Sequence, residues 1–300
     1  MRVVSLLPAA TEIVALLGAT EHLVGVTHEC DYPAIVSSRA RVTSSAITGS
    51  DDAALVDAAV KTLSLQGGAM FTLDEKRIRA LRPDLLLTQA LCDVCAVREA
   101  DVRALAERLQ PQPRVVTLGG ESLGGIYGDI GRVAEAIGAE SEGEELLIGL
   151  RGRVAHVHAV LEHAGAPRPR VALVEWTSPP FIAGHWGPEQ VKRAGGIDVL
   201  GTAGQHSVQV SLTALHDADP EIVLIAPCGY DLARSATEAA RLLDTPDWSW
   251  LAGRQVWALD ANGLVSRPGP RVVDGIETMA RIFNPALFTS LDSRHAVRVR

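Results

Sequence analysis

Short apolar runs alternate with helical patterns along both halves of this 300-residue chain. Uninterrupted runs of about five apolar residues are typical of strands buried on both faces of a parallel sheet. We expect such strands over 2–7, 22–27, 84–88, 114–118, 170–175, 221–226 and 255–259. The apolar spacing between them predicts helices over 11–17, 188–194, 231–243 and 270–283. Strands that alternate with helices predict an α/β fold with doubly wound, parallel-rich sheets.

One longer helical pattern lies in the middle of the chain. Between residues 123 and 163, apolar positions recur three, four or seven residues apart, and glycines near 138–143 can interrupt the helix. Two ordinary helices would explain this pattern, and so would a long backbone helix that joins two lobes. We expect the second arrangement. It gives an N-terminal α/β lobe over 1–122, a linking helical segment over 123–166 and a C-terminal α/β lobe over 167–300.

The two halves repeat a short motif. The segment 82–84, Arg-Pro-Asp, precedes the apolar run 85–87, and the segment 219–221, Asp-Pro-Glu, precedes the apolar run 222–225. Each copy combines a helix end, a proline, an acid and a buried strand, and a cysteine-bearing loop follows each. Loops gather at the carboxyl ends of parallel strands, so duplicated lobes are expected to hold a ligand in a cleft between them.

Several segments form a wider pattern that runs through nearly the whole chain: Arg2–Glu12, Leu16–Gly18, Leu23–Val26, Asp31–Pro33, Arg82–Leu85, Ala194–Gly196 and Pro220–Val223. This pattern resembles the cobalamin- and iron-siderophore-binding proteins of ABC importers, and the cobalamin-binding branch looks closest. The resemblance implies two α/β lobes joined by one rigid helix, a ligand held between them and a non-enzymatic carrier role. It also implies an ABC permease as partner, although no docking acids can be matched residue by residue.

The first residues bear on location. The apolar run 2–7 is interrupted by Pro8, Thr11 and Glu12, and no small-residue cleavage site follows it. The sequence as it stands therefore predicts a cytoplasmic protein, or a periplasmic one if a leader has been removed. No run of about 18 apolar residues predicts a membrane-spanning helix. The net charge of -8, without a dense run of Lys or Arg, argues against nucleic acid as a partner.

Two loops of the first half carry possible metal ligands. His28 and Cys30 follow the second expected strand, and Cys92 and Cys95 form a Cys-x-x-Cys loop after the third. This spacing lets two thiolates reach one zinc ion or iron–sulfur cluster, and it also suits thiol redox exchange. Reduced, partly buried thiols are the simpler interpretation. If metal is bound, the alternative function is a cytoplasmic metal- or iron–sulfur-dependent enzyme that uses Cys30, Cys92 and Cys95.

A histidine–tryptophan pair, His185-Trp186, is flanked by Gly184 and Gly187 in the second half. Trp176 precedes the pair, and we expect this group at the carboxyl end of the first strand of that lobe. Neutral His185 could ligate the cobalt of a corrinoid, a haem iron or another metal. Trp176 and Trp186 could pack flat on a large planar ligand. The alternative is a helix-entry loop that a buried tryptophan anchors.

Two arginines near the start of the last expected helix, Arg267 and Arg271, could hold an anionic group of a ligand. They could equally be surface residues beside a proline stop. The function that we expect is a non-catalytic protein that holds cobalamin or a related corrinoid, with Tyr32 among its contacts. A siderophore or haem carrier is a further alternative, in which Arg267 and Arg271 would matter more than the thiols.

Overall fold

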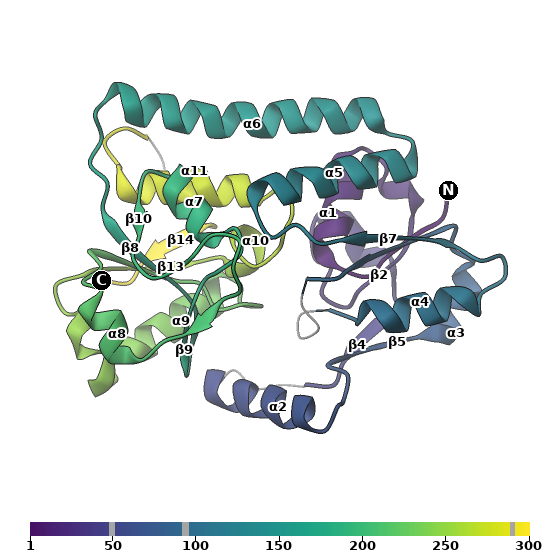
Figure 1. Cartoon of the computed structure of the whole chain (residues 1–300), viewed down its shortest axis with the longest axis horizontal. Coiled ribbons are helices and arrows are strands. Elements are labelled where there is room, and N and C mark those ends of the chain that lie inside the picture. The colour runs from purple at the N-terminus through teal and green to yellow at the C-terminus, as the bar shows by residue number, and fades with distance from the viewer. Residues whose placement is uncertain (48–51, 92–95, 289–291) are drawn as a thin grey trace. The chain divides into compact units, whose positions relative to one another are not determined.

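The computed structural model describes residues 1–47, 52–91, 96–288 and 292–300. Its contacts divide the chain into two compact units. Unit 1 contains residues 1–120 and 124–148, and unit 2 contains residues 121–123 and 149–300. Each unit has its own parallel-rich sheet with helices packed against it (Figure 1), which confirms the predicted α/β class.

Unit 1 is built on a five-stranded sheet in the order β3-β2-β1-β6-β7, and every neighbouring pair is parallel. All residues of β1 and β6 are buried, as expected for strands that are covered on both faces. The strands are β1 (Val3–Ser5), β2 (Leu23–Val26), β3 (Ala40–Arg41), β6 (Leu85–Gln89) and β7 (Arg114–Leu118), with a separate antiparallel pair, β4 (Thr43–Ser45) and β5 (Phe71–Leu73). The helices are α1 (Pro8–Leu16), η1 (Thr20–His22), η2 (Ala34–Ser38), α2 (Ala53–Leu65), α3 (Glu75–Leu81), α4 (Glu99–Glu107) and α5 (Leu123–Ile137).

Unit 2 has a sheet in the order β11-β9-β8-β12-β13-β14, and β10 pairs with β8 beside this path. The strands β8, β10, β12 and β13 are parallel, whereas β9, β11 and β14 run antiparallel to their neighbours. The strands are β8 (Arg170–Thr177), β9 (Pro180–Ile182), β10 (Ile197–Asp198), β11 (Val208–Gln209), β12 (Ile222–Ile225), β13 (Gln255–Leu259) and β14 (Ala296–Arg298). The helices are α7 (Gly187–Arg193), α8 (Leu212–Asp217), α9 (Leu232–Leu243), the 3-10 helix η3 (Pro246–Leu251), α10 (Ala261–Leu264) and α11 (Val272–Phe283).

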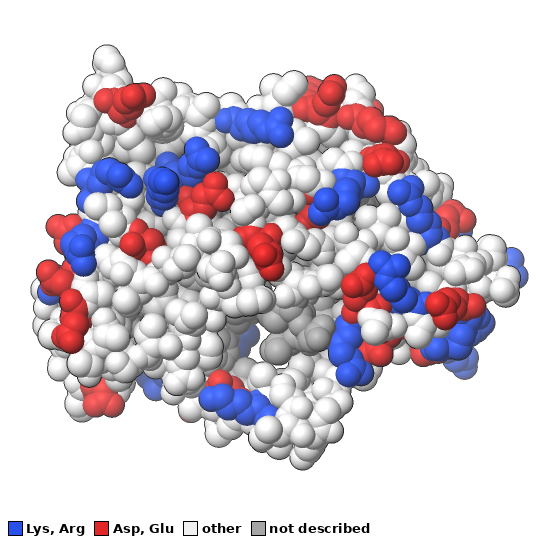
Figure 2. All heavy atoms as spheres, viewed as in Figure 1, with Lys and Arg blue, Asp and Glu red and all other residues white. Residues whose placement is uncertain are grey.

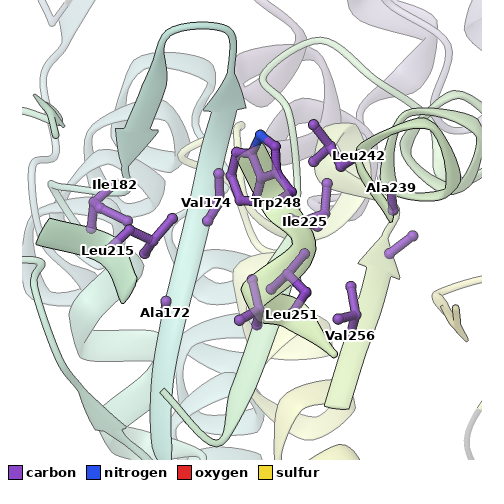
Figure 3. Packing of buried hydrophobic residues seen from close by; sticks show 12 residues of the cluster. Ala172, Val174, Ile182, Leu215, Ile225, Ala239, Leu242, Trp248, Leu251 and Val256 are labelled. Atoms are coloured by element: carbon purple, nitrogen blue, oxygen red, sulfur yellow. The ribbon is translucent and has the colours of Figure 1, made fainter. Parts of the chain in front are cut away.

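The apolar cluster on the sheet of unit 2 is mainly aliphatic, and Trp248 is its large buried aromatic side chain. Trp248 of η3 is only 4% exposed and packs over the central strands among Val174, Ile225 and Leu242 (Figure 3). Burial of this much apolar surface is the main favourable contribution to folding. This packing stabilises the sheet that carries the loops of unit 2.

The helical pattern in the middle of the chain forms two helices. The first is α5, and the second is α6 (Glu140–His163), which is 24 residues long. The break falls at Gly138, whose left-handed φ of 71° suits a glycine at a helix end. Residues of α6 up to Ile148 belong to unit 1, and those from Gly149 onward belong to unit 2. Among the helices of the described ranges, none is both long and apolar enough to cross a membrane.

The repeated motif of the sequence is also repeated in the structure. The residue before each motif proline adopts the left-handed conformation, with φ 43° at Arg82 and φ 48° at Asp219. This conformation ends the preceding helix, and the proline prevents its continuation. Each copy then enters an interior strand of its own sheet, β6 in unit 1 and β12 in unit 2.

An arginine at the start of the first strand holds this motif in each unit. The Arg2 backbone N–H donates to Asp84 Oδ2 at 2.7 Å, and the Arg170 backbone N–H donates to Glu221 Oε2 at 2.8 Å. The side chain of each arginine donates to a carbonyl at the end of the preceding helix, at Leu81 or Ala218. We call each set of contacts an arginine clamp. Each clamp ties the first strand of its unit to the neighbouring strand that follows the motif, β1 to β6 and β8 to β12, at a fixed register.

Acidic and basic side chains are interspersed over the face shown in Figure 2. One ion-pair group within unit 2 joins two helices. Arg153 of α6 donates to Glu277 Oε1 and Oε2 of α11 at 3.0 and 2.8 Å, and it also donates to Asp274. Burial alone would raise the pKa of Glu277, but the hydrogen bonds from Arg153 and the positive charges around the carboxylate together outweigh it, so this pKa lies below its ordinary value.

Arg153→Ala is expected to lower the free energy of unfolding by about 1–3 kcal/mol at pH 7, because three charge-assisted hydrogen bonds are lost. The pKa of Glu277 is depressed in the folded state, so its contribution is present above its unfolded pKa of about 4.3. That contribution disappears as the pH falls through the folded pKa. Urea denaturation of the wild type and the variant at pH 7 and in acid measures this effect. A stability difference that stays constant with pH would contradict it. Arg153→Lys, which keeps the charge and loses the fork, should fall between the two.

Candidate functional site

The chain of unit 2 turns sharply at His185, which follows β9. His185 has a φ of 49°, in the left-handed region that few residues other than glycine adopt. Its N–H donates to Gln205 O at 2.6 Å, and its carbonyl accepts from Gly204 N at 2.8 Å. At Gly184, a Cβ atom would lie 2.3 Å from Gln205 O, so no larger residue fits there without a backbone shift. Such conformations persist where the surrounding structure enforces them, often at functional sites.

The imidazole of His185 is half-buried. Its Nδ1 atom is buried and has no hydrogen-bond partner in the described part of the chain. Burial and the neighbouring His206 lower the pKa of His185, while the Glu121 carboxylate acts in the opposite direction. The ring is therefore held toward its neutral form, which is the form that binds metals.

His206 is a residue that sequence reasoning missed. Its ring centre lies 5.0 Å from that of His185, with the ring planes at 86°. The pairing of β11 with β9 brings the two residues together, with Val208 opposite Ile182. Nothing in the segment around His206 marks it as a motif, and β11 is too short to be recognised from its pattern. Only the folded structure shows this pair.

The predicted position of the His-Trp pair needs a correction. Trp176 does lie near the carboxyl end of β8, but the chain then forms a hairpin and β9 runs back antiparallel. Ala183 N donates to Leu173 O at 2.9 Å, so the chain has already returned along β8 before it reaches His185. The expectation that His185 follows the carboxyl end of this strand is wrong, because β9 was not recognised as a separate strand.

Trp186 is part of the interior of unit 2. It is 5% exposed, and its indole Nε1 donates to Val265 O at 2.7 Å. Beside it, buried Gln190 of α7 donates to Leu264 O and Val272 O, each at 2.8 Å. Trp186 therefore fits the alternative interpretation, a helix-entry loop that a buried tryptophan anchors. The expectation that its ring packs flat on a ligand is not supported, because almost none of its surface is accessible.

Trp176 is more accessible than Trp186. It is half-buried, and its indole Nε1 is a buried donor for which the described residues provide no acceptor. Its ring meets Tyr230 edge-on at 5.7 Å, and the Arg234 guanidinium lies 4.0 Å from the centre of the Tyr230 ring. This aromatic group could present a ring face to a planar ligand.

The two predicted anion-binding arginines lie between α10 and α11. Arg267 is 8% exposed, so it is not the surface residue of the simpler interpretation. Arg271 is half-buried and occupies the N-cap position of α11 without a side-chain cap hydrogen bond. Both residues remain predicted ligand contacts.

In unit 1, His28 lies against Phe71 with ring centres 5.4 Å apart, and its Nδ1 is 2.7 Å from Thr43 Oγ1. Burial, with a smaller contribution from the positive charge of Arg41, lowers the pKa of His28. His28, Phe71 and Thr43 line a cavity of about 10 Å³, which is room for about one water molecule. The cavity is too small to hold a ligand by itself.

The predicted thiol site has a different outcome for each cysteine. Cys30 is 1% exposed, and its Sγ lies 3.1 Å from Thr11 Oγ1 and 3.2 Å from Thr27 Oγ1. These contacts favour the buried-thiol interpretation. Cys92 and Cys95 lie outside the described residues. Within the ranges that are described, no three His, Cys, Asp or Glu side chains are grouped so that they could hold a metal ion. Tyr32 is 40% exposed, as a ligand contact would require.

The chain belongs to the periplasmic binding protein family, whose model matches residues 3–255. A curated relative is the uncharacterized ABC transporter substrate-binding lipoprotein YvrC of Bacillus subtilis. It is 22% identical over 293 residues, which cover 96% of this chain and 81% of the relative. The family membership confirms the resemblance seen in the sequence. It does not support the predicted cytoplasmic location or the alternative of a metal-dependent enzyme.

Two solved structures illustrate the fold. A periplasmic heme-binding protein from Pseudomonas aeruginosa has a TM-score of 0.73 and 22% identity, with 99% of this chain and 97% of that chain covered. The vitamin B12-binding protein BtuF of Vibrio cholerae has a TM-score of 0.64 and 21% identity, with 96% and 98% covered. At this level of identity, the similarity shows a shared fold.

Proposed function

We propose that this protein is the ligand-capturing component of an ABC importer, that it acts outside the cytoplasm, and that its ligand is cobalamin or a related corrinoid. The permease of such an importer would be its protein partner. Family membership over residues 3–255 supports the carrier role. The N-terminal segments that resemble those of cobalamin-binding proteins support the choice of ligand.

The single observation that carries the ligand class is the imidazole of His185. A neutral, half-buried imidazole is suited to coordinate an exchangeable axial position of cobalt or iron. Binding of a corrinoid otherwise depends on shape and apolar area more than on charge. We assign further contacts to Trp176, Arg267 and Arg271 in unit 2 and to Tyr32 in unit 1.

Haem is the second candidate ligand. The structure that is similar over 99% of the chain is that of a heme-binding protein, and its TM-score exceeds that of the vitamin B12-binding protein. Haem iron also accepts an axial imidazole, so His185 would serve either ligand. The arginines Arg267 and Arg271 would then face the propionate groups of haem, since guanidinium binds carboxylates in a bidentate manner.

Titration of the purified chain with hydroxocobalamin and with haemin separates these ligands. We expect one-to-one calorimetric binding of hydroxocobalamin and a shift of its visible spectrum as imidazole replaces the exchangeable axial group. His185→Ala should abolish the shift, whereas the matched control His216→Ala, an exposed histidine of the same unit, should retain it. Binding of haemin alone would reassign the carrier to haem. Absence of heat and of spectral change with both ligands would reject the proposal.

A further inference from the structure

The distance between His185 and His206 fits a particular type of coordination. A metal–imidazole bond of about 2.1 Å places the ring centre roughly 3.2 Å from the ion. Two rings bound at tetrahedral or neighbouring octahedral positions then have centres roughly 4.6–5.2 Å apart. The observed separation is 5.0 Å. The two rings therefore already lie at the spacing of adjacent ligands on one ion.

The same distance excludes a shared tetrapyrrole. A planar macrocycle occupies four equatorial positions and leaves only two opposite axial positions, for which the ring centres would be roughly 6.4 Å apart. Only one of these histidines could coordinate a corrinoid cobalt or a haem iron. The pair therefore calls for a metal whose coordination sphere is open on one side.

We propose that His185 and His206 together bind one divalent transition-metal ion of the Ni²⁺, Cu²⁺ or Zn²⁺ type, with water or a small chelator at the remaining positions. Imidazole nitrogen is a preferred ligand of these ions. This metal site goes beyond the proposed function, because it requires no tetrapyrrole.

The backbone around the pair is suited to such a site. Hydrogen bonds join His185 to Gly204 and Gln205, and Gly184 N donates to Ser207 Oγ at 3.1 Å. Both histidines are therefore carried by segments that are tied directly to each other. A pre-set spacing reduces the entropy lost when an ion is bound. Ligands whose backbone positions are fixed in advance are the basis of a selective metal site.

Charge also favours a cation here. The Glu121 carboxylate, on a segment that belongs to the same unit, interacts electrostatically with His185. The negative charge partly offsets the charge of a bound ion. The buried Nδ1 of His185 is not engaged by another group among the described residues, so binding breaks no existing hydrogen bond at that atom.

Calorimetry of the untagged, metal-free full chain with Ni²⁺ tests the site. We expect a one-to-one complex, and His206→Ala should weaken it at least about tenfold, a loss that even outer-sphere substitutions cause in metal sites. Because His206 is exposed, its variant is expected to keep its fold, which thermal denaturation checks. His216→Ala and His158→Ala, which remove other exposed histidines, should bind as the wild type does.

Electron paramagnetic resonance of the Cu²⁺ complex provides a direct readout. The spectrum should show hyperfine coupling to two imidazole nitrogens in the wild type and to one in His206→Ala. One nitrogen in the wild type, or unchanged Ni²⁺ affinity in His206→Ala, would overturn the proposal. Cobalamin and haemin titrations with a metal chelator present keep this result separate from the proposed function, since neither tetrapyrrole surrenders its metal to the chelator.

Discussion

Replacing Trp186 with alanine is expected to lower the free energy of unfolding by about 3–5 kcal/mol, the range for removing a large buried aromatic side chain. Trp186 is 5% exposed, so its removal leaves a cavity beside α7. It also leaves the carbonyl of Val265 without the indole donor that it has at 2.7 Å. Chemical denaturation followed by circular dichroism measures the loss.

Trp186→Phe separates structure from ligand contact. The ring is partly retained, so this variant should lose about 1–2 kcal/mol, mostly from the missing hydrogen bond and the smaller volume. Its affinity for hydroxocobalamin should be unchanged, because the ring has little accessible surface. Weaker binding by a stable Trp186→Phe variant would restore Trp186 as a ligand contact and show that our correction is mistaken.

Gly184→Ala is expected to cost about 3 kcal/mol or more of unfolding free energy, at the upper end of the range for overpacking, because the new methyl group meets backbone rather than flexible side chains. The added Cβ would lie 2.3 Å from Gln205 O and 2.5 Å from both His206 C and Ser207 N. These segments must separate to admit it. The variant should therefore also lose the two-nitrogen Cu²⁺ signal, even in the fraction that folds.

A matched glycine on the segment that is hydrogen-bonded to His185 isolates the steric effect. Gly204 has a left-handed φ of 73°, but an added Cβ there meets nothing within 4 Å. Gly204→Ala should therefore cost only the conformational penalty of about 1–2 kcal/mol. Thermal and urea denaturation of both variants give the comparison. Equal losses would show that the close approach at Gly184 adds no steric cost beyond the ordinary cost of a substituted glycine.

The central strands were predictable from the sequence for a physical reason. In a parallel sheet that is covered on both faces, every side chain of a central strand is buried, so the strand is an uninterrupted apolar run. The predicted strand 84–88 overlaps β6 and the predicted strand 221–226 contains β12, and every residue of these two strands is buried. The proline-acid motif located β6 and β12 because it combines a helix stop with strand entry.

The edges of the sheets were not predictable in this way. Strands β10 and β11 have two residues each, which is too few for any periodic pattern. They form because the rest of the sheet provides a partner. His206 was missed for the same reason, since its proximity to His185 depends on β11.

Burial also decided between interpretations that the sequence left open. Glycine beside an aromatic residue fits both an exposed contact and a packed anchor, and only the contacts of Trp186 distinguish them. Cys30 is similar, because its thiol is enclosed by Thr11 and Thr27, which are 19 and 3 residues away. A linear pattern contains the residue type but not the neighbours that determine its environment.

The residues of the two arginine clamps, which align the strands, are different from the loop residues that are free to vary. Each clamp closes within its own half, using an arginine at the start of one strand and an acid at the start of another. Both lie at the amino ends of the strands, opposite the ends from which the longer loops leave. Substitutions and insertions in those loops therefore leave the alignment of the strands unchanged. The ligand specificity of such a scaffold can change while its folding stays the same.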